Sequence, residues 1–264
     1  MYAPAESNLR GSIPSEIVCL SKLRRLQVDN NALWGSIPGT SISDSSTNQL
    51  PMSTNPTLGL HHLTSLEVLD LHNNALSGIA FNDSIEDSLF LHATGLRTIY
   101  LHGNRELSGS IPLSLQYASK LINLSLMGCS FHGTLPQALG KLSNLEFLQL
   151  YDNELSGSIP SSILQLSEIS YLSLGHNKFT GTIPSFGGSA QSNLYLISLS
   201  MNQFTGPIPS SLSSLSILQV SEKSSRRLEK LCEHFNSLFW ISILIVAAFW
   251  LLPNPFSKRS LYCP

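Results

Sequence analysis

LSNLEFLQLYDNELSGSIP, residues 142–160, is the stretch of sequence that decides the fold. Its leucines, its asparagine and its closing glycine and proline return along the chain in the same order. The glycine recurs at Gly109, Gly133, Gly157 and Gly181, at a constant interval of 24 residues. A period in this range is typical of a solenoid, in which each repeat is one structural unit that packs on its neighbours. We therefore expect one elongated domain of about eight repeats.

The spacing within the repeat predicts how each unit is built. Leu148 and Leu150 lie two positions apart, so both side chains leave one face of a short strand and enter the core. Equivalent strands of neighbouring repeats then form a parallel sheet. Gly157 suits a turn with positive φ, and Pro160 ends a second short strand. We expect 142–145 to form a short helix or 3₁₀ turn on the opposite, convex side.

One polar position of the repeat is predicted to be structural. Asn153 follows the strand, and its amide both donates and accepts, so it can satisfy buried backbone groups at the bend. Cys129 replaces asparagine in one repeat, where we expect a buried thiol. The predicted ladder consists of Asn31, Asn74, Asn104, Cys129, Asn153, Asn177 and Asn202.

This pattern resembles the plant-type leucine-rich repeat of receptor-like kinases, receptor-like proteins and secreted inhibitor proteins, over roughly residues 8–220. The resemblance implies a right-handed α/β solenoid with a concave parallel sheet and short convex helices or 3₁₀ turns. It also implies non-catalytic recognition of a peptide, glycan or protein ligand by the concave face, and a partner receptor kinase for signalling. Only a short tail follows Leu252, so we expect no kinase domain in this chain, and no cofactor.

The rest of the sequence suggests four segments. We expect the solenoid at 1–220 with an inserted loop at 39–59, a charged amphipathic segment at 221–234, a transmembrane helix at 235–252 and a tail at 253–264. The span is short but uncharged, with Trp240 and Trp250 near its ends. Met1 leads directly into the second half of a repeat, so we expect the sequence to be truncated upstream and to lack a secretory signal.

Composition limits the partners. The formal net charge is −2 and no basic stripe is present, which argues against nucleic acid. The four cysteines, Cys19, Cys129, Cys232 and Cys263, are scattered and leave the redox compartment open. No catalytic motif is found, and the only phosphate-loop likeness has the wrong spacing.

The exposed strand positions are the candidate ligand-binding residues, because tyrosine is favoured at interfaces. They are Asp70, His72, Tyr100, His102, Phe147, Gln149, Tyr151 and Tyr171. His72 and His102 could stack beside Asp70 as a metal-binding or pH-sensing pair, but a surface role is the simpler interpretation and no metal is predicted.

Two glycosylation sequons begin at Asn82 and Asn123. They agree with a single-pass membrane protein whose repeats lie at the cell surface. The absence of a visible signal and of paired cap cysteines favours the alternative, a cytoplasmic leucine-rich-repeat scaffold or regulatory protein.

Overall fold

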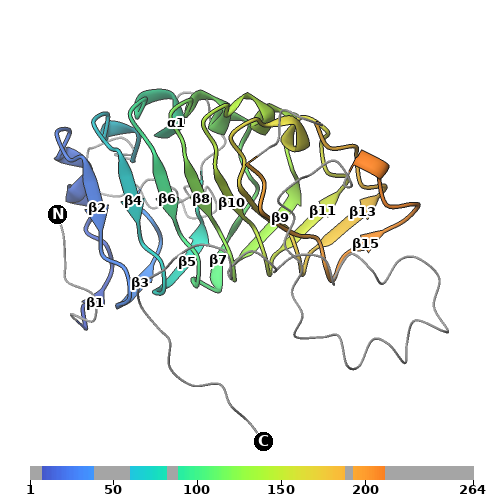
Figure 1. Ribbon diagram of the computed structural model, residues 1–264. Coiled ribbons are helices and arrows are strands. Elements are labelled where there is room, and N and C mark those ends of the chain that lie inside the picture. Colours follow the sequence, from blue (N-terminus) through green and yellow to red (C-terminus); the bar gives the residue numbers. More distant parts are fainter. Residues whose placement is uncertain (1–7, 39–59, 82–88, 188–192, 212–264) are drawn as a thin grey trace, which may run out of the picture.

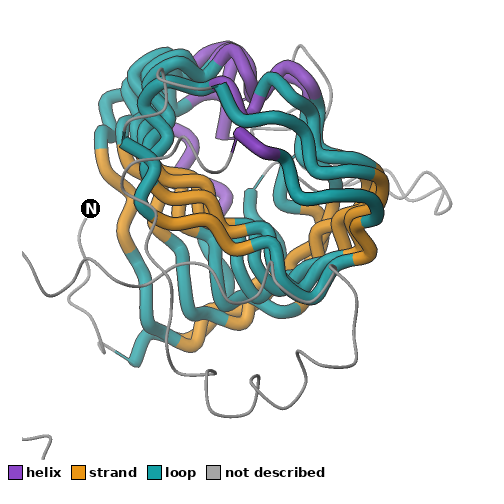
Figure 2. The backbone as a smooth tube through the Cα atoms, turned by 45° about the vertical axis from the view of Figure 1, so that its right-hand side comes forward, coloured by secondary structure: helices purple, strands orange, loops and turns teal. Residues whose placement is uncertain are grey.

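The computed structural model describes residues 8–38, 60–81, 89–187 and 193–211, and within these ranges the chain winds as a solenoid. Figure 1 shows the coils stacked side by side, with the short helices along one edge. Figure 2, turned from that view, shows each coil as a closed loop with strands on two of its sides. The predicted solenoid fold is confirmed.

The first sheet has seven parallel strands in the order β14-β12-β10-β8-β6-β4-β2. We call it the concave sheet, because it contains the exposed positions predicted above. Its strands are β2 Arg25–Gln27, β4 Val68–Asp70, β6 Thr98–Tyr100, β8 Asn123–Ser125, β10 Phe147–Gln149, β12 Tyr171–Ser173 and β14 Leu196–Ser198.

The second sheet has eight parallel strands, made by the second half of each repeat, in the order β1-β3-β5-β7-β9-β11-β13-β15. These strands are β1 Arg10–Gly11, β3 Ala32–Gly35, β5 Ala75–Ile79, β7 Glu106–Gly109, β9 Ser130–Thr134, β11 Glu154–Gly157, β13 Lys178–Gly181 and β15 Gln203–Phe204. Gly157 ends β11 with φ 75°, as the turn prediction required.

Short helical turns connect the second sheet back to the concave sheet. They are η1 Ser15–Cys19, η2 Leu60–His62, α1 Leu89–His92, η3 Leu113–Tyr117, η4 Gln137–Lys141 and η5 Ile163–Gln165. The turn predicted at 142–145 was placed too late, since η4 starts after Pro136 and ends at Lys141. Leu142 and Leu145 are fully buried, and they belong to the segment that leads from this turn into the core.

The repeat leucines form one continuous core between the two sheets and the helical turns. Leu142 has no exposed surface, whereas Leu20, at the equivalent position of an earlier repeat, is 49% exposed. Leu20 belongs to the first described concave-sheet repeat, whose strand β2 has a neighbour on one side only, β4. Burial of a repeat leucine therefore depends on the adjoining repeat.

The longer intervals in the sequence do not shift the strand register. Val68 pairs with Thr98, and Asp70 with Tyr100, across an interval that is longer than the regular repeat. Arg25 pairs with Val68 across the inserted segment 39–59, which lies outside the described residues. The parallel pairing of the concave strands is therefore kept across both longer intervals.

The predicted segments from residue 221 onward, including the C-terminal helix and the span at 235–252, lie outside the described residues. Among the described helices, none has the length and apolar character that a bilayer crossing needs.

Candidate functional site

The asparagine ladder lies under the bend that ends each concave strand. Asn153 is 8% exposed, and its Nδ2 donates to the carbonyl oxygens of Leu126 at 2.8 Å and Leu150 at 3.1 Å. Its Oδ1 accepts the backbone N–H of Phe131 at 2.9 Å. Each amide therefore joins its own repeat to the preceding one, which makes this row a structural element and not part of the binding surface.

Cys129 occupies one rung of this ladder with weaker bonds. Its Sγ lies 3.4 Å from the carbonyl oxygen of Leu101, and a thiol cannot accept a backbone N–H as an amide oxygen does. In the preceding repeat the N–H of Leu107, which such an amide oxygen would accept, donates instead to the carbonyl oxygen of Asn104 at 3.0 Å. The extra residue between Asn104 and Leu107 makes this local turn possible, so the insertion compensates for the cysteine.

A row of left-handed residues precedes the ladder, and the sequence reasoning missed it. Asn30, Asn73, Asp152, His176 and Met201 have φ between 51° and 58°. Gly103 and Gly128 fill the same place in two further repeats. The sequence does indicate this row, because asparagine, aspartate and glycine tolerate positive φ best, and most repeats have one of them just before the ladder residue.

The outward-facing positions of the concave sheet fall into two chemically different groups, and Asp70, which was predicted to be exposed, is buried with 6% exposure. The acid–histidine group lies on β2, β4 and β6 and the bends that follow them, and consists of Asp29, Asp70, His72, Tyr100 and His102. The aromatic group lies on and beside β10, β12 and β14, and consists of Phe147, Tyr151, Tyr171, His176 and Tyr195. Strand β8 separates them, so the predicted residues form two groups and not one continuous patch.

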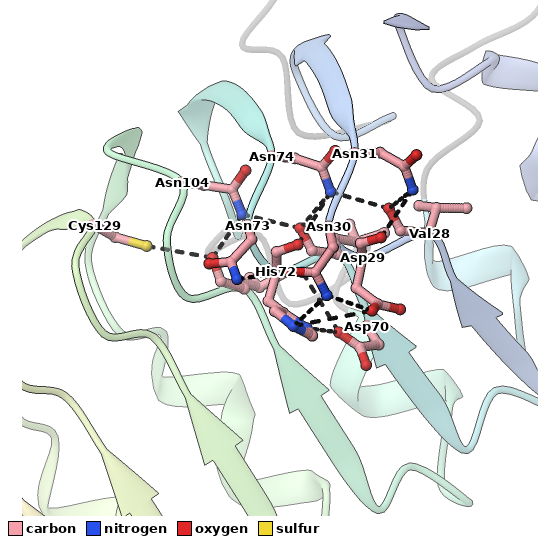
Figure 3. Close-up of polar contacts among 12 residues, drawn as sticks. Val28, Asp29, Asn30, Asn31, Asp70, His72, Asn73, Asn74, Asn104 and Cys129 are labelled. Atoms are coloured by element: carbon pink, nitrogen blue, oxygen red, sulfur yellow. Dashed lines mark hydrogen bonds and ion pairs between the residues drawn. The ribbon is translucent and has the colours of Figure 1, made fainter. Parts of the chain in front are cut away.

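In the acid–histidine group the side chains contact one another directly (Figure 3). His72 and His102 stack with ring centroids 4.3 Å apart and an interplanar angle of 16°. The Nδ1 of His72 lies 2.5 Å from Oδ1 of Asp70. Asp29, which the prediction of binding residues left out, brings its Oδ2 within 4.0 Å of the other ring nitrogen of His72.

Burial and neighbouring charges shift two titrations in this group. Burial and the nearby imidazole of His72 lower the pKa of His102, and Asp70 opposes them. Burial, with a smaller contribution from the Asp70 carboxylate, raises the pKa of Tyr100. Near neutral pH, His102 is therefore an uncharged imidazole and Tyr100 an intact phenol.

In the aromatic group the rings follow one another across the strands. Phe147 and Tyr171 stack at 6.3 Å, and Tyr195 contacts Tyr171 edge-on at 6.1 Å. Tyr151 stacks on His176 at 5.8 Å and lies against Gly175, where an added Cβ would be 3.1 Å from its ring. Burial raises the pKa of Tyr195. Such amphipathic rings offer large contact area at low entropic cost.

The remaining predicted residues have simpler surroundings. Gln149 is half-buried on β10 between Ser125 and Ser173. Asn123 stands on β8 in the concave sheet, where its Nδ2 is 3.3 Å from Oγ1 of Thr98. Asn82 lies outside the described residues.

Comparison with known proteins gives the same fold. The family model described as Leucine Rich Repeat matches residues 65–84, 144–166, 168–189 and 193–215. The crystal structure of a TDR receptor is similar to this chain with a TM-score of 0.66 and 30% identity, over 80% of this chain and 32% of that one. A PEPR1–AtPEP1 complex is similar with a TM-score of 0.65 and 33% identity, over 79% of this chain and 26% of that one.

The Arabidopsis receptor kinase HAESA, solved with the peptide hormone IDA and the co-receptor SERK1, gives a TM-score of 0.64 and 28% identity, over 78% of this chain and 30% of that one. This chain thus spans about a third or less of the length of each of these three structures. The structural similarity covers the leucine-rich repeats of this chain.

Proposed function

We propose that this plant-type leucine-rich-repeat protein, whose solenoid is like those of receptor kinase ectodomains, binds a peptide or protein ligand on its concave sheet without catalysis. The observation that carries this proposal is the pair of outward-facing side-chain groups on that sheet. One group offers carboxylates and imidazoles, the other a row of stacked rings, and both lie on one sheet whose strands the asparagine ladder joins.

The geometry suits an extended peptide that runs across the strands. Successive strands of a sheet lie about 4.8 Å apart, so a ligand crossing β4 to β12 passes both groups. Aromatic side chains such as Tyr151 and Tyr171 supply apolar contact, while Asp70 and Tyr100 supply hydrogen bonds. The HAESA structure, which was solved with the peptide hormone IDA, supports this choice of ligand class.

We further propose a receptor-like role at the cell surface, with a membrane anchor at 235–252 and a separate receptor kinase as signalling partner. The HAESA complex with a co-receptor supports such a partner, and the uncharged sequence of residues 237–252 supports the anchor. Asn123 provides a direct test of the compartment. A deglycosylation gel shift that disappears in the Asn82→Gln/Asn123→Gln variant is expected for repeats that enter the secretory lumen. A folded chain with no shift would favour a cytoplasmic scaffold.

Ligand binding is tested by selecting peptides from a displayed library against the full chain. Peptides enriched on the wild type should lose at least tenfold in affinity for the Tyr100→Ala/Tyr151→Ala variant, which removes one ring from each group. The matched control is Trp34→Ala, which removes an exposed ring from β3 in the second sheet. Equal affinity for all three proteins would refute binding by the concave sheet.

A further inference from the structure

Three side chains of the acid–histidine group meet in a way that the proposed peptide binding does not require. Asp29, Asp70 and His72 each offer one ligand atom, and these atoms all lie within 4.8 Å of one another. They come from two adjacent repeats: Asp70 ends β4, and Asp29 and His72 lie in the bends that follow β2 and β4. Figure 3 shows the three side chains pointing toward a common centre.

In the described part of the chain, no lysine or arginine balances the two carboxylates at this centre. Only 14% of the Asp29 side chain and 9% of the Asp70 side chain are exposed. Among the described residues, neither carboxylate pairs with a lysine or an arginine, and His72 is the sole ion-pair partner of both. Two carboxylates held this close with little solvent favour a cation between or beside them.

The imidazole of His72 is oriented as in metal-binding histidines. Its Nδ1 faces the Asp70 carboxylate, which leaves Nε2 directed at Oδ2 of Asp29. A carboxylate on one ring nitrogen commonly fixes the tautomer that ligates a metal through the other. His102 stacks on the same ring and restricts its rotation.

The amide of Asn30 now fills the space between the two ligand atoms. Its Nδ2 lies 2.9 Å from Oδ2 of Asp29 and 3.2 Å from Nε2 of His72. An N–H₂ group that donates to both atoms is a weak electrostatic substitute for a cation. Asn30 is half-buried in the bend after β2, and its Oδ1 accepts from Nδ2 of Asn73 at 2.9 Å, so its side chain must give up this bond to make room for a cation.

We propose that this cluster binds a divalent transition-metal ion through the carboxylate of Asp29 and Nε2 of His72, while Asp70 holds the imidazole through Nδ1. A nitrogen and a carboxylate oxygen suit zinc and its neighbours, whereas Ca²⁺ requires six or more oxygen ligands. Zinc–ligand bonds of about 2.0–2.1 Å place ligand atoms about 3.3 Å apart, so side-chain rotation must shorten the 4.0 Å between Oδ2 of Asp29 and Nε2 of His72 slightly. Two protein ligands leave coordination positions for water or for a group of a second molecule.

The chain contains a matched control for this site. Asp152 and His176 form another aspartate–histidine pair, through Oδ1 and Nδ1, on the same face. Both side chains are 51% exposed, and the described residues place no second carboxylate and no stacked imidazole there. If any aspartate–histidine pair sufficed, this one would bind metal as well.

The test is a calorimetric titration of the full chain with Zn²⁺, with Ca²⁺ and Mg²⁺ as competing ions. We expect one equivalent to bind, at least tenfold more weakly in Asp29→Asn and in His72→Gln, with no change in His176→Gln. The variant His62→Gln removes part of the histidine group His61, His62 and His92 on the helical edge and should also leave this binding unchanged. Circular dichroism establishes that each variant is folded.

A second measurement reads the ligand directly. On addition of Zn²⁺, the nitrogen chemical shift of one ring nitrogen of His72 should change, while those of His176 should not. Two results would overturn the proposal: no zinc binding by the folded wild type, or equal zinc affinity in Asp29→Asn and His72→Gln. Because the probe is the metal alone, these results leave the proposed peptide binding to its own test.

Discussion

The buried and exposed rows of the same strands follow different rules. On the inward-facing side, the middle residue of each concave strand is leucine or isoleucine, such as Leu124, Leu148 and Ile197, and all are buried. On the outward-facing side, the row that contains Asp70 and Tyr100 varies in chemistry, with glutamine, aspartate, tyrosine or serine at equivalent positions. The difference shows that packing between repeats fixes the inner rows, while the outer rows are free to differ in chemistry from one repeat to the next.

Removing a ladder amide should give the largest loss of stability. In Asn153→Ala, the buried N–H of Phe131 and the carbonyl oxygen of Leu126 lose their partner, whereas the carbonyl oxygens of Leu150 and Tyr151 keep Nδ2 of Asn177 and the N–H of Gly128. Buried groups left unpaired cost about 1–3 kcal/mol each, so we expect a fall of about 3 kcal/mol in the free energy of unfolding. Urea denaturation measures it.

The control for that change is an outward residue on the same strand. Gln149→Ala should alter the free energy of unfolding by less than about 0.5 kcal/mol. Comparable losses from the two substitutions would contradict the separation between inner and outer rows.

Cys129 should make the free energy of unfolding depend on pH in the alkaline range. Burial raises the pKa of the Cys129 thiol to about 11, from 9.0, so the folded state binds a proton that the unfolded chain releases. Stability from this group is complete below pH 9 and is lost as the pH rises toward 11, by about 2 kcal/mol. Unfolding measured from pH 8 to pH 11 should show this slope in the wild type and a smaller one in Cys129→Ser. Identical slopes in the wild type and Cys129→Ser would show that the buried thiol does not cause the loss of stability.

The bend before the ladder offers a stabilising substitution. Met201 has φ 55° and is 69% exposed. Its left-handed backbone is sterically unfavourable, and its exposed side chain contributes little hydrophobic stabilisation to offset this. Met201→Asn, which copies Asn30 and Asn73, should raise the free energy of unfolding by about 0.5–1 kcal/mol. Met127→Asn, at a position without positive φ, should give no gain, and a gain there would point to a general effect of the amide.

The smallest stability effect is expected from a glycine that shapes the outer surface. A Cβ at Gly175 would lie 3.0 Å from Oγ of Ser198 and 3.1 Å from the ring of Tyr151, both of which can move. Gly175→Ala should therefore change the free energy of unfolding by less than about 0.5 kcal/mol. Chemical shifts of Tyr151 and His176 should nevertheless change, because the ring leaves its present stack. Unchanged shifts would show that Gly175 does not position the ring.

Much of the inner structure could be predicted because it depends on spacing. The interval from Leu148 to Leu150, and from these to Asn153 and Gly157, places each residue on a strand face or in a turn, so the period alone indicates the core and the bends. The turn at η4 was placed too late because leucine periodicity marks the core and not the exposed residues before it.

The outer structure depends on side-chain rotamers and on pairing between distant residues. The contact of Asp29 with His72 requires knowing that β2 pairs with β4 across the long insertion, which spacing alone cannot show. The turn from Asn104 to Leu107 could not be predicted for a similar reason. An insertion in one repeat compensated for a substitution in the next.

The position of the ligand on the solenoid is tested most directly by photo-crosslinking. A photoreactive residue replaces Gln149 on the concave sheet or His132 on the second sheet, and a peptide selected on the wild type is added. The account predicts a crosslink from position 149 and none from position 132. A crosslink from position 132 alone would place the ligand on the second sheet and contradict recognition by the concave sheet.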